Sequence, residues 1–169
     1  MLDTDQDYVA AVRFSSDGRW ALCMGSQPAV AVWDMQKRKI TRRLNSEEIF
    51  RALADGCVSR DGRRALTWGD RHDLYLWDLE QGRFLKAIYL DTLALDDRIT
   101  ALALSNDGKR GLVSVRKQGV YIVDLNTGKP VHLFAEHDGN VNCLLVTGDG
   151  RSVVSGGSDG EIRLWRLPE

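Results

Sequence analysis

Short apolar runs recur along the whole chain, each about seven residues long and each bounded by polar turn residues. Examples are 9–15 (VAAVRFS), 19–25 (RWALCMG) and 63–69 (RRALTWG). Runs of this length that are rich in Val, Leu and Ala and punctuated by Gly, Asp and Ser predict β-strands. Several of them are apolar nearly throughout instead of alternating with polar residues. This pattern indicates sheets that are buried on both faces.

Four Asp-Gly dipeptides, each followed by Lys or Arg, lie between pairs of these runs. The aspartates are 44, 46 and 42 residues apart along the chain. Because glycine adopts the positive φ of a tight turn without steric cost, Asp-Gly between two apolar runs predicts a β-hairpin. The four predicted turns contain Asp17 and Gly18, Asp61 and Gly62, Asp107 and Gly108, and Asp149 and Gly150.

A third apolar run follows each hairpin and closes with a pair of residues at a constant distance. The second residue of the pair lies 17 positions after the aspartate of Asp-Gly in every copy, as from Asp17 to Asp34. Further turns, such as 78–83 (DLEQGR), lead to a fourth run. The constant spacing indicates four copies of one four-stranded unit, and the closing pairs are Trp33-Asp34, Trp77-Asp78, Val123-Asp124 and Trp165-Arg166.

These four copies resemble the repeats of the WD-repeat family of β-propellers, whose period is about 40–45 residues. The resemblance covers essentially the whole chain after Tyr8, and two copies carry the literal Trp-Asp dipeptide. It implies an all-β fold of four blades, each a four-stranded antiparallel sheet, arranged as a partial or open ring. The last blade is expected to have three strands, because Pro168 follows its third run and stops further pairing. The implied parts are a lead at 1–7 and blades at 8–48, 49–97, 98–136 and 137–169.

In the last copy, the resemblance implies a structural hydrogen-bond tetrad made of His137, Ser155, Asp159 and Trp165. In that arrangement the Trp indole bonds to Ser, Ser to His and His to Asp, which ties the strands of one blade together. A Ser-His-Asp hydrolase is the alternative for the same residue types, but it needs an exposed serine beside an oxyanion hole. Ser155 is expected in the middle of a strand, which favours the structural role. The other copies have Cys23, Thr67 and Val113 at the serine position.

Composition and charge exclude several classes of function. Lys and Arg number 23 and Asp and Glu 24, so the net charge of −1 gives no basic excess for nucleic acid. No apolar run approaches the ~20 residues that span a bilayer, and the acidic start of the chain lacks the features of a secretory signal. Three cysteines without a Cys-x-x-Cys pair favour reduced thiols and a cytoplasmic location. No metal, cofactor or phosphate loop is expected, since His72 and His132 have no further ligand at suitable spacing.

The family resemblance implies a non-catalytic scaffold that binds proteins or peptides through the loops at one end of the blades. A second hypothesis is a sensor or autoinhibitory segment of a larger WD-repeat protein, such as one that carries a NACHT-type nucleotide-binding module. Self-association of two copies is a further expectation, because it would complete the propeller. The candidate partner-binding residues are basic side chains in two loops, which alternatively are solvated turn charges: Arg71, His72, Arg116 and Lys117.

Overall fold

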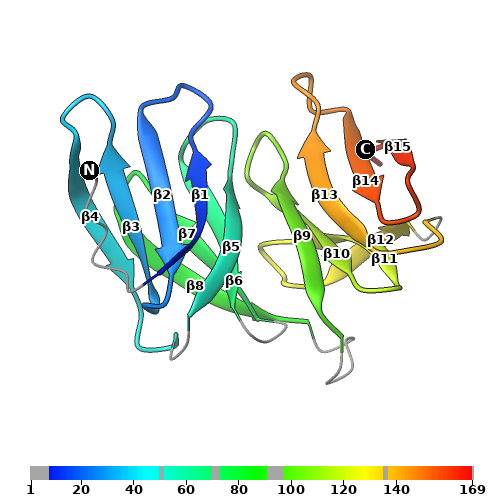
Figure 1. Cartoon of the computed structure of the whole chain (residues 1–169), viewed down its shortest axis with the longest axis horizontal. Helices are drawn as coiled ribbons and strands as arrows, with labels where there is room; N and C mark the ends of the chain where they lie inside the picture. Colours follow the sequence, from blue (N-terminus) through cyan, green and yellow to red (C-terminus); the bar gives the residue numbers. More distant parts are fainter. Residues whose placement is uncertain (1–7, 50–51, 70–72, 91–96, 135–136, 169) are drawn as a thin grey trace.

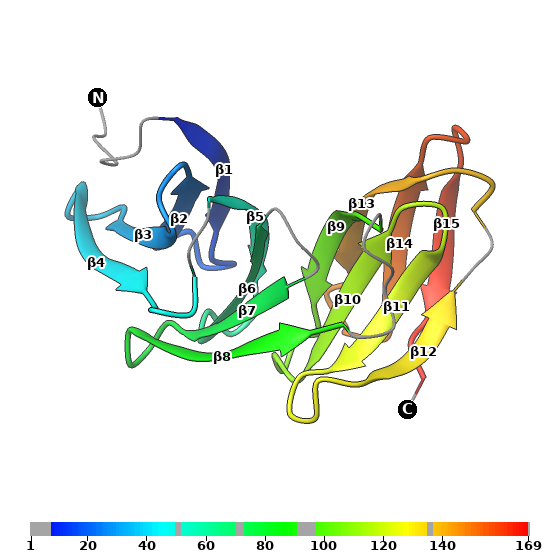
Figure 2. The same ribbon diagram turned by 90° about the horizontal axis from the view of Figure 1, so that it is seen from below.

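The computed structural model describes residues 8–49, 52–69, 73–90, 97–134 and 137–168. In these residues the chain forms fifteen β-strands and no helix. The strands make four antiparallel sheets, which follow one another like the blades of a propeller (Figures 1 and 2). The all-β propeller that the repeats predict is confirmed.

Each sheet is called a blade below, and within a blade every strand pairs with the next one along the chain. The first three blades have four strands and the fourth has three, as the sequence predicts. Blade 1 contains β1 (Val9–Phe14), β2 (Trp20–Gly25), β3 (Ala29–Asp34) and β4 (Lys39–Asn45). Blade 2 contains β5 (Leu53–Val58), β6 (Arg64–Gly69), β7 (Asp73–Asp78) and β8 (Arg83–Tyr89). Blade 3 contains β9 (Ile99–Leu104), β10 (Arg110–Val115), β11 (Gly119–Asp124) and β12 (Pro130–Phe134). Blade 4 contains β13 (Val141–Val146), β14 (Ser152–Gly157) and β15 (Ile162–Arg166).

The Asp-Gly turns between the first two strands of each blade share one hydrogen-bond network. In blade 1 the Ser15 hydroxyl donates to Asp17 Oδ1 at 2.6 Å and accepts from the Trp20 backbone N–H at 3.0 Å. Asp17 Oδ1 also accepts from the Arg19 N–H at 2.9 Å, and Gly18 has the positive φ of +68° that favours glycine. The equivalent hydroxyls belong to Ser59, Ser105 and Thr147. Each turn therefore uses a Ser or Thr two residues before the aspartate, a requirement that the Asp-Gly pattern alone does not reveal.

The aspartate that closes the third strand organises the next turn in three blades. Asp34 Oδ1 accepts hydrogen bonds from the backbone N–H groups of Gln36 and Lys37 at 3.0 and 2.9 Å. Asp78 and Asp124 accept equivalent bonds in blades 2 and 3. In blade 4 an arginine takes this position, and β15 is the last strand that the structure describes.

Neighbouring blades are held together by apolar side chains that fill the space between their sheets. Leu22 and Val30 of blade 1 pack in one buried cluster with Tyr75 and Trp77 of blade 2. Similar clusters lie between blades 2 and 3 and between blades 3 and 4. A sheet that is covered on both sides needs apolar residues at nearly every position, which is the pattern found in the sequence.

Polar side chains add a second link between successive blades. Arg64 Nη1 donates to the Gly108 carbonyl at 2.9 Å, and Asn106 Nδ2 donates to the Gly148 carbonyl at 3.2 Å. Both bonds join residues about one repeat apart, 44 and 42 positions along the chain. The Asp-Gly turns thus contribute to the contact between blades as well as to the fold of each blade.

The turn network leads us to expect a loss of stability in acid. The hydrogen bond from the Ser15 hydroxyl, helped by the Arg19 N–H, lowers the pKa of Asp17 below its ordinary value. Thr147 lowers the pKa of Asp149 in the same way. A carboxyl with a lowered folded-state pKa adds stability above its unfolded pKa of about 3.9, and this is lost as the pH falls through the folded value. We expect the urea midpoint, followed by tryptophan fluorescence, to fall below about pH 4.

The hydroxyl of Ser15 provides the control for this acid dependence. Ser15→Ala removes the donor that lowers the Asp17 pKa most, so this variant should lose less stability between neutral and acid pH than the native chain does. Ser46→Ala is the matched change outside the turns, since the Ser46 hydroxyl accepts from the Glu48 N–H. The same acid dependence in Ser15→Ala as in the native chain would contradict the assignment.

Candidate functional site

Four polar side chains of blade 4 form a continuous chain of hydrogen bonds. His137 precedes β13, Ser155 is on β14, Asp159 lies in the following turn and Trp165 is on β15. Trp165 Nε1 donates to Ser155 Oγ at 2.7 Å, and Ser155 Oγ lies 2.8 Å from His137 Nε2. His137 Nδ1 lies 2.8 Å from Asp159 Oδ2. The structure thus brings together the four side chains to which the family resemblance assigns a tetrad.

The chemistry of these groups sets the direction of each bond. The indole N–H of Trp165 can only donate, so Ser155 Oγ accepts it and keeps its own proton available for His137 Nε2. The Asp159 carboxylate can only accept, so the proton between it and the imidazole is on Nδ1. Burial acts to raise the pKa of Asp159, but the hydrogen bonds from His137 and from the Glu161 N–H hold it below its ordinary value.

Hydrolase triads use the same three side chains at similar distances, so the surroundings decide between the two roles. Ser155 is 0% exposed, and the His137 side chain is 1% exposed. A nucleophilic serine must reach a substrate carbonyl and lie beside oxyanion donors. Because Ser155 is enclosed and already accepts the indole N–H, the geometry favours the structural role.

Blades 2 and 3 replace parts of the tetrad without leaving a polar group unpaired at those of its positions that the structure describes. In blade 2, Trp77 Nε1 donates to Thr67 Oγ1 at 2.9 Å, and the buried Ile49 occupies the histidine position. In blade 3, Val113 and Val123 are both fully buried and supply only apolar contacts. Blade 2 thus keeps one hydrogen bond of the network, and blade 3 relies on packing at the described positions.

Blade 1 keeps the tryptophan but lacks its acceptor. Cys23 stands at the serine position and is buried beside Trp33 in one apolar cluster. Within the described part of the chain, no group accepts a hydrogen bond from the buried Trp33 Nε1. An unpaired buried donor of this kind lowers stability, typically by about 1–3 kcal/mol.

The candidate partner-binding residues fall in two loops, of which the structure describes one. Arg71 and His72 lie outside the described residues. Arg116 and Lys117 form the turn between β10 and β11, where both are exposed and Lys117 has a φ of +59°. Lys117 also lines a hollow of about 310 Å³ on blade 4, where the buried Oδ1 atom of Asn140 has no hydrogen-bond partner within the described residues.

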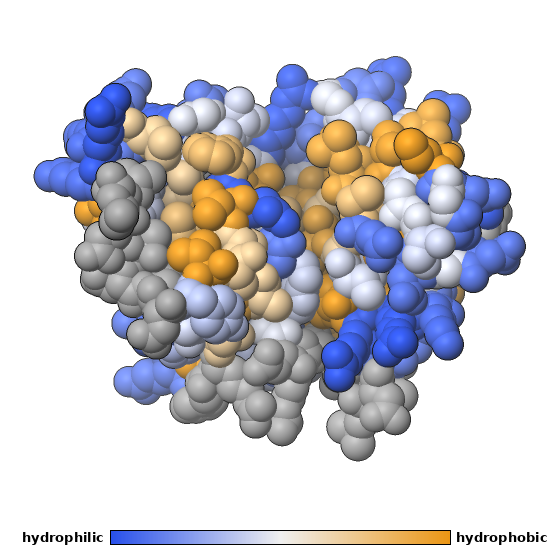
Figure 3. All heavy atoms as spheres, viewed as in Figure 1, coloured by the Kyte–Doolittle hydropathy of each residue, from blue (hydrophilic) through white to orange (hydrophobic). Residues whose placement is uncertain are grey.

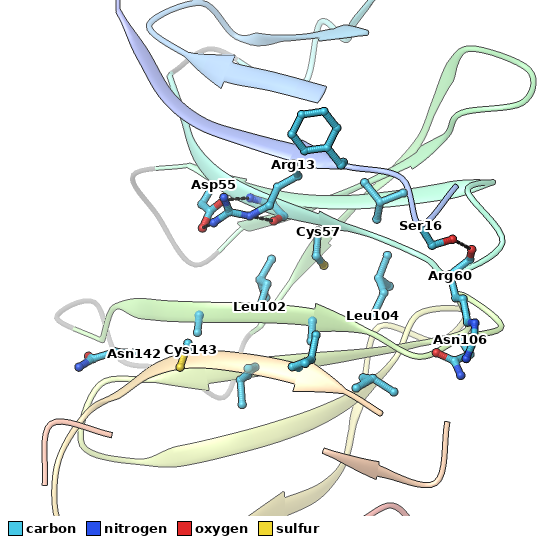
Figure 4. Close-up of a pocket in the computed structure, with 18 of the residues that line it drawn as sticks. Arg13, Ser16, Asp55, Cys57, Arg60, Leu102, Leu104, Asn106, Asn142 and Cys143 are labelled. Carbon is cyan, nitrogen blue, oxygen red and sulfur yellow. Dashed lines mark hydrogen bonds and ion pairs between the residues drawn. The ribbon is translucent and has the colours of Figure 1, made fainter. Parts of the chain in front are cut away.

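A larger groove of about 580 Å³ runs along the inner strands of all four blades, β1, β5, β9 and β13 (Figure 4). Leu102 and Leu104 lie in its middle, with Asn142 toward one end and Asn106 and Arg60 toward the other. The sequence pattern points to the loops for partner binding and gives no indication of this surface. Its lining comes from strands about one repeat apart along the chain, so no single motif in the sequence indicates it.

The sides of the groove carry one ion pair and two thiols. Arg13 pairs with the Asp55 carboxylate, and Arg13 Nε donates to the Gly56 carbonyl at 3.1 Å. Burial, with a smaller contribution from Asp55, raises the pKa of the Cys57 thiol. A protonated thiol is a poor nucleophile, and Cys143 is exposed without a histidine on the groove wall. The groove is therefore suited to binding more than to covalent chemistry.

Metal binding and membrane crossing find no support in the part of the chain that the structure describes. No group of three or more His, Cys, Asp or Glu side chains there could hold a metal ion. The same residues include no helix with the length and apolar character that a membrane crossing requires.

The repeated four-stranded blades, their Asp-Gly turns and the tetrad of blade 4 define a β-propeller built from sequence repeats. Residues 128–166 match the family described as "WD domain, G-beta repeat". This match lies on the last strand of blade 3 and on blade 4, and the four-bladed propeller fold agrees with the resemblance of all four repeats to that family, whose propellers are generally non-catalytic scaffolds for protein interactions.

Several curated proteins are similar to parts of the chain. Protein ROOT INITIATION DEFECTIVE 3 of Arabidopsis thaliana is 36% identical over 69 residues, which are 41% of this chain and 16% of that protein. Serine-threonine kinase receptor-associated protein of Dictyostelium discoideum is 31% identical over 77 residues, 46% of this chain and 26% of that protein. Human Striatin-4 is 42% identical over 50 residues, 30% of this chain and 7% of that protein. The matched stretches thus span at most about a quarter of these relatives.

The tetrad assignment can be tested by a double-mutant cycle. Ser155→Ala should lower the free energy of unfolding by about 1–3 kcal/mol, because it leaves Trp165 Nε1 and His137 Nε2 without their hydrogen-bond partner. His137→Ala acts through the same network, so the two losses together should be clearly less than additive. Urea unfolding of the four proteins gives the coupling energy, and additive losses would show that the tetrad does not act as a unit.

Supplying an acceptor for the unpaired Trp33 indole should raise the free energy of unfolding, whereas the substitutions in the tetrad should lower it. Cys23→Ser places a hydroxyl where blade 4 has Ser155, so it should raise the free energy of unfolding by about 0.5–1.5 kcal/mol. Cys23→Ala is the control, since it removes the thiol without supplying an acceptor and should not stabilise. Urea unfolding measures both, and an equal loss in the two variants would exclude the predicted bond.

Proposed function

We propose that the chain is a non-catalytic, cytoplasmic scaffold without a cofactor, and that its groove binds an extended segment of a partner protein. The observation that carries the proposal is the groove along β1, β5, β9 and β13, to which all four blades contribute. Its volume of about 580 Å³ lies within the range typical of binding sites. Resemblance to a family of interaction scaffolds supports the same function.

The lining of the groove indicates the chemistry of its ligand. The floor of the groove is apolar in its middle, where Leu102 and Leu104 keep 8% and 5% of their surface exposed, and it suits contact with an apolar side chain of a peptide. The side-chain amides of Asn106 and Asn142 can each donate and accept hydrogen bonds, as the peptide backbone does. An extended peptide with apolar anchors and polar ends matches this order of groups.

The loop with Arg116 and Lys117 is a second candidate surface for the same function. Both cations are exposed, and the unpaired Oδ1 of Asn140 lies in the hollow that Lys117 lines. An acidic peptide would supply a carboxylate to the cations and an N–H donor to the amide oxygen. The sensor hypothesis stays a prediction, since it concerns segments beyond these 169 residues.

A peptide-display experiment separates the two surfaces. Random peptides are selected on the immobilised chain, and the affinity of the enriched peptides is then measured by fluorescence anisotropy. Asn142→Arg fills one end of the groove from an exposed position, so it should weaken binding at least about tenfold. Asn126→Arg is the matched control, because Asn126 is exposed in the β11–β12 turn outside the groove.

The charge-reversed pair Arg116→Glu and Lys117→Glu completes the test. It should leave binding unchanged if the groove holds the peptide. Loss of binding in this variant but not in Asn142→Arg would move the site to the loop. Failure to enrich any peptide would argue against the scaffold function.

A further inference from the structure

Each blade presents one face to the blade that follows it, here called the forward face. Its positions lie 5, 7, 13 and 15 residues after the aspartate of Asp-Gly, which in blade 1 are Leu22, Met24, Val30 and Val32. The equivalent residues are Leu66, Trp68, Leu74 and Leu76 in blade 2, and Leu112, Ser114, Val120 and Ile122 in blade 3. None of these twelve residues is more than 8% exposed. The forward face is therefore a stacking surface in three blades.

The forward face of blade 4 has the same apolar character but is open. Ile162 and Leu164, at the positions of Val30 and Val32, are 80% and 71% exposed. Leu145 on β13 is also exposed, at 66%. Figure 3 shows apolar side chains gathered over this end of the molecule. A patch of large aliphatic side chains in this position lacks the cover that every other forward face receives.

The opposite face of blade 1, here called the backward face, is open as well. Val12 and Phe14 lie 5 and 3 residues before the aspartate and are 42% and 56% exposed. The equivalent residues of blade 3, Leu102 and Leu104, are only 8% and 5% exposed because they pack against blade 2. Trp33, whose indole N–H has no partner within the described residues, stands on the same face. Blades 1 and 4 of these described residues thus present two uncovered stacking faces of complementary kind.

We propose that the occupant is a second copy of this chain, with blade 4 of each copy stacked on blade 1 of the other. Each contact joins a forward face to a backward face, as inside the chain, and two such contacts related by a twofold axis close on themselves. The arrangement covers all four open faces of the two copies and encloses their grooves around one axis. It does not depend on the function proposed above.

Side-chain sizes on the two open faces match each other. Between blades 1 and 2, the large Met24 lies against Gly56, where a Cβ atom would come within 3.0 Å of the Met24 sulfur. The equivalent positions on the open faces are Gly156 on blade 4 and Val12 on blade 1. The larger residue is on the forward face between blades 1 and 2 and would be on the backward face here, whereas Trp68 and Leu102 are both large between blades 2 and 3. The contact between blades therefore accepts the combination of sizes that a second copy of the chain would bring.

The mass of the purified chain in solution tests the proposal. Size-exclusion chromatography with light scattering should give a dimer, twice the 18.9 kDa of one chain, that dissociates on dilution. Leu164→Glu on the forward face and Phe14→Glu on the backward face should each give a monomer. Val131→Glu is the matched control, because Val131 is 57% exposed on β12, outside both faces, and this variant should remain a dimer.

A mixing experiment distinguishes the stacked contact from unspecific association. A Leu164→Glu copy and a Phe14→Glu copy can still form one intact contact, so an equimolar mixture should form a heterodimer although neither variant associates alone. A native chain that stays monomeric at all concentrations would overturn the proposal. It would indicate that something other than a second copy covers the two faces. A dimer that persists in both variants would also overturn it, as would oligomers that grow with concentration without closing. Asn142→Arg should leave the mass unchanged, so a failed peptide experiment and a failed association experiment remain separate results.

Discussion

A β-sheet with apolar side chains on both faces is stable in water only when both faces are covered. Blade 2 shows this constraint: Ala65 and Trp77 belong to the cluster with blade 1, Leu66 and Leu74 belong to the cluster with blade 3, and all four are fully buried. Burial of one such leucine contributes about 1.5–3 kcal/mol, whereas an exposed ion pair contributes about 0–1 kcal/mol. Stacking therefore outweighs polar links such as the half-exposed pair of Arg13 with its partner on β5.

The polar network within a blade is secondary to this packing, and the four blades show why it can vary. Replacing both partners of a buried hydrogen bond by apolar groups costs little, whereas removing one partner leaves the other unsatisfied. In blade 3 both partners are replaced, since Val113 and Val123 stand in place of the serine and the tryptophan. In blade 1 only one partner is replaced, and Cys23 does not accept the indole N–H of Trp33. A complete tetrad is thus one of several ways to fill the same space between sheets.

Most of the fold could be predicted from the sequence because each blade repeats the same local requirements. Strand order and the Asp-Gly turns follow from the spacing of the repeats, and the three-stranded last blade follows from Pro168 after its third run. The predicted first strands were one residue too long, as at Ser15, because the hydroxyl of that residue belongs to the turn network. The pattern of apolar and polar residues locates the end of a strand only approximately, because the polar residue that follows the strand can belong to the turn.

The groove could not be predicted from the sequence, because it is formed by strands that lie about one repeat apart and meet only when the blades stack. Positions that face a neighbouring blade are restricted: 15 residues after the aspartate, the four copies have Val32, Leu76, Ile122 and Leu164. Positions that line the groove are not restricted in this way. Four residues before the aspartate, the copies have Arg13, Cys57, Ala103 and Leu145. The two sets overlap, however, because Ala103 belongs to the cluster between blades 3 and 4 and Leu145 lies on the forward face of blade 4. A change at such a position acts on stacking as well as on binding, whereas a change at the exposed Arg13 leaves the packed clusters intact.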